Sequence, residues 1–337
     1  MYPLDRGLWG PTVRIMHLRD ELMRLVDLDL ADGYRPGRRV ALARYALSGR
    51  LHGLDGIYVE SSTFLPAETD LAFLGLARAL RVPVLTYVRD AYQLFDDYGL
   101  PRTVRHRAAR TAFRPMIRAL RAVSSQMAVP SAGLAEALGL DDAALLPPGA
   151  PPPAEVARSP DANRLLFVGD ARLPAHGADR LIVGVERARE QGSAVELELV
   201  CRAGQEPPGP LPAWVHIVRA EGSQIVDRLP RIVATVIPRP RNAYNDLALP
   251  IKLFDYLSYG RPLIVTDCTE QARVVAAADA GVVTADDPAA IAEALIRVVD
   301  APVERVERWS ANATAAARAA SWQDRARQIV DLLMTAS

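Results

Sequence analysis

Short apolar runs alternate with amphipathic segments along most of the chain. Runs rich in β-branched and other apolar residues occur at 56–60, 82–88, 165–169, 195–201, 233–237, 262–265 and 281–283. Segments with apolar residues at helical spacing lie between or beside them, at 12–26, 69–80, 178–190 and 288–299. Because the apolar runs have the length of strands and alternate with helical patterns, the sequence predicts an α/β fold whose parallel sheets are covered by helices.

A proline-rich run divides this pattern near its middle. The segment LLPPGAPPP, residues 145–153, lacks several backbone donors and has several fixed φ angles, so neither helix nor sheet can continue through it. With 337 residues, half of them apolar, the chain is long enough for two cores. We therefore expect domains at 1–150 and 151–320, followed by a final helix over 321–337 that begins with capping-box spacing from Ser321 to Asp324.

Charge, cysteine content and missing motifs exclude several classes of protein. The 40 basic and 40 acidic residues balance, so no net field attracts nucleic acid. Cys201 and Cys268 lack the number and spacing of a disulfide framework or zinc site, and neither an apolar leader nor a membrane span is found, which predicts a cytoplasmic protein. No GxGxxG follows a predicted strand and no GxxxxGK[ST] occurs, which disfavours a nicotinamide oxidoreductase and a P-loop enzyme.

Lysine occurs once in the chain, and its position is informative. Of the 40 basic residues only Lys252 is a lysine, and two of the four asparagines, Asn242 and Asn245, stand in the loop before it. We expect Pro250 in the first turn of a helix that ends at Gly260, which places Lys252 in that first turn. A cation there is unfavourable by roughly 0.3–1 kcal/mol, so the position favours a bound counter-anion.

The first turn of this helix predicts a diphosphate site. Free backbone N–H groups at a helix start bind anions, and Lys252 adds a positive charge, with Asp255 three residues on along the same side. The alternative is an intrahelical ion pair between Lys252 and Asp255 without a ligand. In a chain so rich in arginine, an arginine would serve such a pair equally well, so the diphosphate interpretation is favoured.

The segment PIKLFDYLSYGRPLIVTD, residues 250–267, resembles the donor-site motif of retaining GT-B glycosyltransferases of the family called group 1 or family 4. The resemblance implies two Rossmann-like domains facing each other across a cleft, with the final helix returning to the first domain. It implies transfer of a sugar, with retention, from a nucleotide diphosphate sugar of UDP or GDP type. The acceptor would be a lipid-linked molecule or a glycan, and neither a cofactor nor a metal ion is expected.

Within this motif, Asp255 takes the place of the acid that holds the ribose hydroxyls. The acid that contacts the transferred sugar would fall at Leu247, so Asn245 or Asp246 is expected to supply that contact instead. The sugar and phosphates are expected to face the backbone of Leu249, Pro250, Ile251 and Lys252.

Other segments of the second half carry further parts of the resemblance. Residues 167–182, FVGDARLPAHGADRLI, are similar to the family's phosphate-gripping loop, with Arg172 at its arginine and His176 at its lysine. An imidazole is mostly neutral at pH 7 unless a phosphate raises its pKa, so this substitution reduces the positive charge. The family places its loops around the nucleotide base at the positions of Arg202, Glu221 and Gly222.

In the first half, the resemblance implies an acceptor loop and a catalytic pair. Gly7, Trp9 and Gly10 look like the glycine-bearing loop near the acceptor, preceded by a short strand at 1–4. Arg89 stands where the family has a histidine, and Asp90 follows it. A cation at this place would stabilise the departing diphosphate. The alternative is a loop salt bridge without catalytic value.

The stretch 99–135 contains no acidic residue, although arginines crowd its helical pattern from Arg102 to Arg121, interrupted at Pro115. A basic segment of this kind can contact anionic lipid, at roughly 1 kcal/mol per basic side chain near the surface. Two interpretations stay open: a solvated basic face, or peripheral contact with the inner face of the membrane.

Two further functions are compatible with a GT-B fold. A sugar-nucleotide-binding module without catalysis is suggested by the unusual residues Leu247, His176 and Arg89 at three motif positions. A non-hydrolysing sugar-nucleotide epimerase is disfavoured, because the sequence shows no convincing pair of acids. Transfer to an acceptor therefore remains the leading hypothesis.

Overall fold

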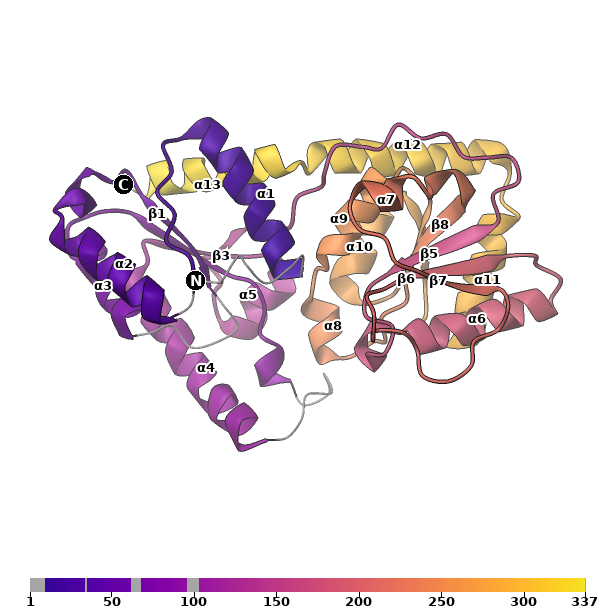
Figure 1. Ribbon diagram of the computed structural model, residues 1–337, viewed down its shortest axis with the longest axis horizontal. Helices are drawn as coiled ribbons and strands as arrows, with labels where there is room; N and C mark the ends of the chain where they lie inside the picture. Colours follow the sequence, from indigo (N-terminus) through magenta and orange to yellow (C-terminus); the bar gives the residue numbers. More distant parts are fainter. Residues whose placement is uncertain (1–9, 34, 62–67, 96–102, 337) are drawn as a thin grey trace. The chain divides into compact units, whose positions relative to one another are not determined.

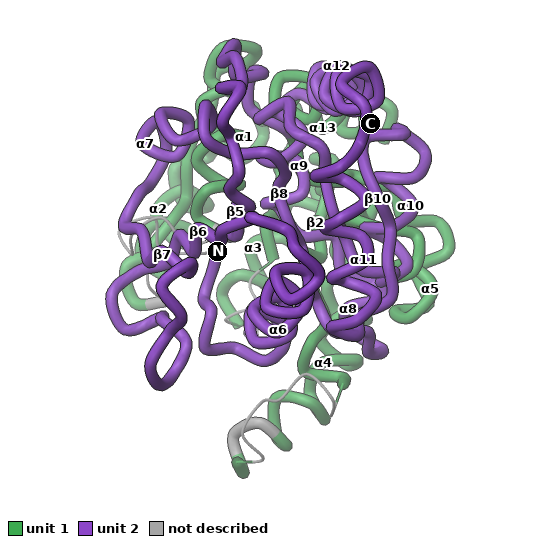
Figure 2. Tube along the Cα trace, turned by 90° about the vertical axis from the view of Figure 1, so that its right-hand side faces the viewer, with its two compact units in different colours: residues 1–149, 322–337 green, residues 150–321 purple. Residues whose placement is uncertain are grey.

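The computed structural model describes residues 10–33, 35–61, 68–95 and 103–336, without the side chains at 10, 11, 35, 105 and 106. The chain forms two compact units (Figure 1). Unit 1 comprises Met1–Gly149 and Trp322–Ser337, and unit 2 comprises Ala150–Ser321 (Figure 2). Each unit contains one parallel sheet flanked by helices, so the predicted α/β fold is confirmed.

Unit 1 is built on a four-stranded parallel sheet in which the strands lie in sequence order. The strands are β1 (Ile57–Ser61), β2 (Val84–Val88), β3 (Gln126–Val129) and β4 (Ala144–Leu145). Its helices are α1 (Gly10–Leu25), α2 (Arg35–Leu47), α3 (Glu68–Ala79), α4 (Val104–Val123), α5 (Ala132–Leu138) and α13 (Trp322–Thr335). The strand expected at 1–4 lies outside the described residues.

The last helix of the chain packs within unit 1, beside the first described helix. Helices α1 and α13 lie side by side (Figure 1), and the rings of His17 and Trp322 stack with their centroids 5.3 Å apart. A Cβ at Gly149 would lie 2.5 Å from the Trp322 ring, so only glycine fits at this position in the middle of the proline-rich run.

Unit 2 contains a six-stranded parallel sheet of order β10-β9-β8-β5-β6-β7. The strands are β5 (Arg164–Val168), β6 (Glu196–Val200), β7 (Val215–Val218), β8 (Ile232–Ile237), β9 (Leu263–Thr266) and β10 (Gly281–Thr284). The helices are α6 (Ala178–Glu190), α7 (Ser223–Val226), α8 (Ala243–Leu247), α9 (Ile251–Ser258), α10 (Thr269–Ala278), α11 (Pro288–Val299) and α12 (Val303–Ala319).

The strand order of unit 2 reverses between β5 and β8. The chain proceeds outward from β5 through β6 to β7, then returns to β8 and proceeds the other way through β9 to β10. In doubly wound sheets, ligands bind outside the carboxyl ends of the strands at such a reversal. The topology therefore points to the loops that follow β5 and β8.

Two helices differ from their predicted form, both at a proline. Pro250 is the N-cap residue of α9 rather than part of its first turn, because the helix begins at Ile251. Helix α4 runs through Pro115 without interruption. Pro115 has no N–H group that could donate a hydrogen bond to the Thr111 carbonyl oxygen, four residues earlier. Both residues are exposed, so a water molecule can donate to this oxygen instead.

Candidate functional site

Lys252 extends from α9 to the carboxyl end of β5. Its ammonium group donates a hydrogen bond to the Val168 carbonyl oxygen at 3.0 Å and lies 4.7 Å from the centre of the Phe167 ring. A Cβ at Gly169 would lie 3.1 Å from the same nitrogen, so glycine leaves room for the ammonium group. The only lysine of the chain therefore lies at the strand reversal, where the topology predicts a ligand.

In the described part of the chain, Lys252 forms no ion pair, and Asp255 in particular does not pair with it. The intrahelical pair considered from the sequence is therefore not formed. Burial and the neighbouring Arg239 guanidinium lower the pKa of Lys252 to about 7. A half-buried amine with a cationic neighbour and no counter-ion is energetically unfavourable, which favours an anionic ligand.

Arg239 is a second cation at this place, and the sequence pattern gives no sign of it. It follows β8, is only 6% exposed, and donates a hydrogen bond from Nη2 to the Asn245 side-chain oxygen. Its Nη1 is buried, and no hydrogen-bond partner or acidic group is found for it among the described residues. Its charge also contributes to the lowered pKa of His176. The carboxyl ends of β5 and β8 thus present two uncompensated cationic side chains.

Asn245 supports this site from within the protein. Its side chain is fully buried, and its amide nitrogen donates to the Pro240 carbonyl at 2.7 Å and the Ala175 carbonyl at 3.4 Å. Because its amide oxygen is also engaged, by Arg239, the expected direct contact of Asn245 with a sugar is not supported. Asp246 is half-buried, and its carboxylate accepts a hydrogen bond from Arg241 at 3.2 Å. Of the two residues expected to contact the transferred sugar, Asp246 is therefore the remaining candidate.

His176 contributes no positive charge. Its Nδ1 lies 2.8 Å from the Asp170 carbonyl oxygen, and because a carbonyl only accepts, Nδ1 carries the proton. Burial, followed by the Lys252 ammonium, lowers the pKa of His176 to about 3, so the ring is neutral at pH 7. Arg172 is half exposed and bonds both oxygens of the Asp170 carboxylate, at 3.2 and 2.9 Å. Arg172 is thus already paired, unlike the buried cations.

Asp255 lies on α9, one turn after Lys252. Its carboxyl is half-buried, and burial raises its pKa to about 7. Among the described residues, no hydrogen bond to this carboxylate is found, although the neighbouring Tyr256 hydroxyl accepts one from the Val168 amide at 2.7 Å. A poorly hydrated carboxylate of this kind gains most from hydroxyl donors on a ligand.

Some of the backbone amides at the start of α9 can donate hydrogen bonds to a ligand. Ile251 is the first residue of the helix, and Leu249 packs half-buried against the core of unit 2. Pro250 has no N–H group, so its expected amide contact is chemically excluded, and the amides that can donate are those of Leu249, Ile251 and Lys252.

The expected base loops lie together at the ends of neighbouring strands. Arg202 follows β6 and pairs with Glu221, which follows β7, at 3.1 Å. Gly222 is the N-cap residue of the short helix α7, and its φ of +53° is a conformation that favours glycine. The pairing of β6 with β7 thus brings these three residues to one end of the sheet.

In unit 1, Arg89 and Asp90 follow β2 and form an ion pair at 3.1 Å. Their side chains are 11% and 15% exposed, so this is not a solvated surface pair. Burial raises the pKa of Asp90 although Arg89 opposes the rise, and Asp90 Oδ1 is buried without a partner among the described residues. Gly10 is the first residue of α1. Gly7 and Trp9 lie outside the described residues.

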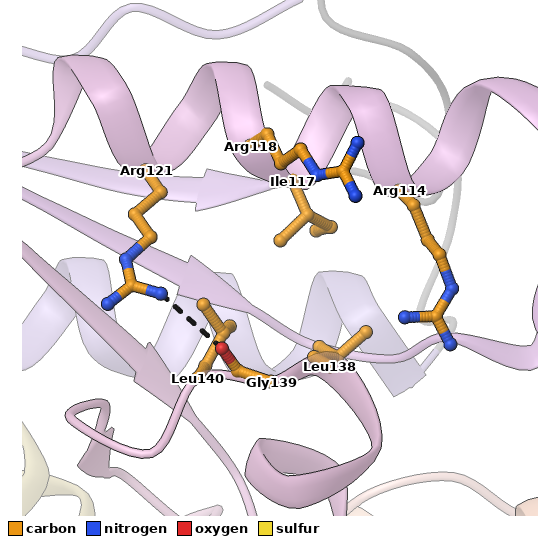
Figure 3. A pocket seen from close by; sticks show the side chains of 7 residues that line it. All are labelled: Arg114, Ile117, Arg118, Arg121, Leu138, Gly139 and Leu140. Carbon is orange, nitrogen blue, oxygen red and sulfur yellow. Dashed lines mark hydrogen bonds between the residues drawn. The ribbon is translucent and has the colours of Figure 1, made fainter.

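The basic segment forms helix α4, whose apolar side belongs to the core of unit 1. Phe113, Met116, Ile117 and Leu120 are buried there, so the helix cannot insert this side into lipid. A hollow with a volume of about 250 Å³ lies between α4 and the turn after α5 (Figure 3). Three exposed arginines line it: Arg114, Arg118 and Arg121.

The described residues contain neither a candidate membrane span nor a candidate metal-binding cluster. No described helix combines the length and apolar character that crossing a bilayer requires. No group of three or more histidine, cysteine or acidic side chains suited to a metal ion was found in the described part of the chain.

Comparisons with known proteins agree with the geometry of unit 2. Residues 162–301 match the family model "Glycosyl transferases group 1". Curated protein sequences gave no match. Solved structures similar to nearly the whole chain include the following two. A UDP-forming α,α-trehalose-phosphate synthase from Burkholderia xenovorans in complex with glucose-6-phosphate is 14% identical, with 98% of this chain and 83% of that chain covered and a TM-score of 0.60.

The second is sucrose-phosphate synthase from Thermosynechococcus elongatus, 14% identical, with 100% of this chain and 96% of that chain covered and a TM-score of 0.64. At these identities the structural likeness establishes the fold, and the predicted GT-B fold is confirmed. The family match covers the strand reversal, Lys252 and Asp255. The chain therefore has the GT-B fold, its residues 162–301 are similar to group 1 glycosyltransferases, and together these findings support a glycosyltransferase enzyme.

Proposed function

We propose that the chain transfers a sugar from a nucleotide diphosphate sugar to an acceptor, with retention and without a metal ion. The main support is the Lys252 ammonium group, which lies at the strand reversal of unit 2 without a counter-ion in the described residues. A diphosphate supplies the missing negative charge, and the amides at the start of α9 can bind it further. Asp255 would hold the ribose hydroxyls, and Asp246 the transferred sugar.

In the proposed reaction, the bond between the anomeric carbon and the diphosphate oxygen breaks. A bond from the acceptor oxygen to the same carbon forms on the same face, and the acceptor's hydroxyl proton passes to the departing phosphate oxygen. Lys252 would stabilise the negative charge that develops on the diphosphate. The Arg89 and Asp90 pair of unit 1 would act on the acceptor.

The donor is tested by thermal shift with UDP, GDP, ADP and TDP, alone and as nucleotide sugars. We expect UDP or GDP to raise the Tm of wild type and to have little effect on Lys252→Ala. Lys252→Arg should retain part of the effect, because it keeps the charge without the compact ammonium geometry. Equal nucleotide affinity in wild type and Lys252→Ala would contradict the diphosphate assignment.

Turnover separates the enzyme from a binding module. Release of nucleoside diphosphate should depend on an acceptor and should survive a chelator, because side-chain cations and helix amides replace the metal. Binding without release under any acceptor would favour the non-catalytic module. A strict requirement for added Mg²⁺ or Mn²⁺ would contradict metal-free transfer.

We also propose that α4 contacts an anionic membrane surface through electrostatics alone. Among the described residues, Arg114 and Arg118 have no acidic partner, and arginines at helical spacing repel each other, by about 0.2–0.5 kcal/mol per pair. Co-sedimentation should show binding to phosphatidylglycerol vesicles that fails with phosphatidylcholine and at high salt. The double change Arg114→Gln and Arg118→Gln should weaken binding more than Arg187→Gln and Arg297→Gln, two exposed arginines of unit 2. Equal losses would contradict a role for α4.

A further inference from the structure

We infer that Arg239 is a second phosphate-binding cation of the donor site, oriented by Asn245. Arg239 precedes the segment that carries the resemblance, which begins at Pro250, and no recognised motif residue points to it. The inference rests on the proposed function, because it assigns a further residue to the same diphosphate.

Arg239 is held rigidly at the carboxyl end of β8. Prolines flank it on both sides, and its carbonyl oxygen accepts a hydrogen bond from the Thr266 hydroxyl at 2.6 Å. A Cβ at Gly177 would lie 1.7 Å from the Pro238 carbonyl oxygen, so the loop after β5 packs directly against this backbone. Asn245 then fixes the guanidinium by accepting from Nη2. The cation is preorganised before any ligand arrives.

Arg239 differs from the other buried arginines that the structure describes. Arg14 pairs with Glu60 at 2.9 Å, and Arg38 pairs with both oxygens of Asp70 at 2.9 Å. Arg261 instead donates to several backbone carbonyls, including that of Leu229 at 2.9 Å. Arg239 has neither arrangement, since one neutral amide oxygen is its acceptor and Nη1 is buried without one. A charge buried this way is costly unless an anion completes the site.

A phosphate is the anion that best fits these surroundings. The groups that face Lys252 are Arg239 from the loop after β8, the Val168 carbonyl at the end of β5, and neutral His176 from the loop after β5. On α9 itself, Asp255 forms no pair with Lys252. The cations come from opposite sides of the strand reversal, so a diphosphate between them could contact both. Binding would raise the affinity of Lys252 for its proton, and a proton would be taken up at about pH 8.

The test measures inorganic pyrophosphate binding by calorimetry, so that base and sugar play no part. We expect Arg239→Gln to weaken binding roughly tenfold to a hundredfold, the usual effect of losing a charge-assisted hydrogen bond. Arg239→Lys should restore part of the affinity. Arg241→Gln is the matched control, because Arg241 is half-exposed in the same loop and pairs with Asp246 and Asp267. Its affinity should equal that of wild type.

Lys252 supplies a readout that a purely structural role of Arg239 would not change. Because it is the only lysine, selective ¹³C labelling of lysine gives one side-chain signal from which its pKa is read. Removing the Arg239 charge should raise this pKa, whereas Arg241→Gln should leave it unchanged. Calorimetry in buffers of different ionisation enthalpy should also show less proton uptake in Arg239→Gln than in wild type.

The outcomes separate the two proposals. If Arg239→Gln binds pyrophosphate like wild type while Lys252→Ala does not, the role of Arg239 is overturned and the donor site stands. If wild type binds neither pyrophosphate nor UDP nor GDP, the donor site itself is overturned, and Arg239 with it. If Arg239→Gln fails to fold, Asn245→Ala takes its place. This variant keeps the positive charge of Arg239 but removes the hydrogen bond that orients its guanidinium group. Weaker pyrophosphate binding in that variant supports the inference, and unchanged binding overturns it.

Discussion

Replacing Lys252 by methionine should stabilise the folded protein while abolishing nucleotide binding. The folded-state pKa of Lys252 is about 7, whereas an unfolded lysine titrates near 10.4. A shift of roughly 3 pKa units corresponds to about 4 kcal/mol of destabilisation at pH 7. Methionine has similar length and no charge, so it removes this cost but loses the hydrogen bond to Val168, worth about 1 kcal/mol. We expect a net stabilisation of about 2–4 kcal/mol.

The stability gained by Lys252→Met should depend on pH, because Lys252 releases its proton at a lower pH in the folded chain than in the unfolded chain. Between about pH 7 and pH 10 the unfolded chain binds a proton at Lys252 that the folded chain has released, so wild-type stability rises with pH in this window. The advantage of Lys252→Met should be full below pH 7 and should disappear near pH 10. For a domain of this size, about 2–4 °C per kcal/mol implies a Tm increase on the order of 5–10 °C at pH 7.

Thermal unfolding of both proteins across this pH range, without nucleotide, provides the assay. Lys252→Arg serves as the control, because it keeps a charge in the same place and should not gain stability. A Tm of Lys252→Met equal to or below that of wild type at pH 7 would refute the reasoning. So would a directly measured Lys252 pKa near 10.4, because the proposed cost would then not exist.

Two further predictions concern neighbouring residues. Asp255→Asn should weaken binding of nucleoside diphosphates even without a sugar, measured by calorimetry. It should also remove one of two opposing pH effects expected near pH 7, because protonation of Asp255 weakens binding as the pH falls whereas protonation of Lys252 strengthens it. Normal binding of UDP or GDP by this variant would remove Asp255 from the ribose site. Gly177→Ala should lower the Tm by an amount equivalent to at least about 2 kcal/mol, since φ is +74° and the new Cβ would collide with the Pro238 carbonyl. Gly192→Ala is the control, because Gly192 has φ +95° but open space around it, and this change should cost about 1 kcal/mol of stability. Equal losses of stability in the two variants would show that the backbone shifts to relieve the collision at Gly177.

The fold was predictable where local signals agreed with burial. The helix bounds 178–190 and 288–299 agree with α6 and α11, and α11 begins after the N-cap residue Asp287, whose side chain accepts from the amides of Ala289 and Ala290. Strands β3, β4 and β7 were not predicted. They have four, two and four residues, and β7 is mostly half-buried, so their apolar patterns are too short to separate from those of loops.

The candidate site was predictable only in part, and the cause is the composition of the chain. An excess of arginine makes Lys252 stand out, because a lysine retained there suggests a requirement that arginine does not meet. The same excess hides Arg239, which is one arginine among many in a loop that contains another at Arg241. Its significance depends on burial and on the missing partner of Nη1, which are properties of the folded protein.

Asn245 is a second residue whose role the sequence alone could not determine. Its nearness to the family's sugar-contacting position suggested a ligand contact, but its full burial shows that it holds Arg239 and the Pro240 backbone instead. A polar residue near a binding motif can contact the ligand or orient a residue that does, and spacing alone does not separate these roles. Here burial and hydrogen bonding separate them, since the strand reversal places the end of β8 and Arg239 at the site, while the fully buried side chain of Asn245 is already bonded to the protein at both its oxygen and its nitrogen.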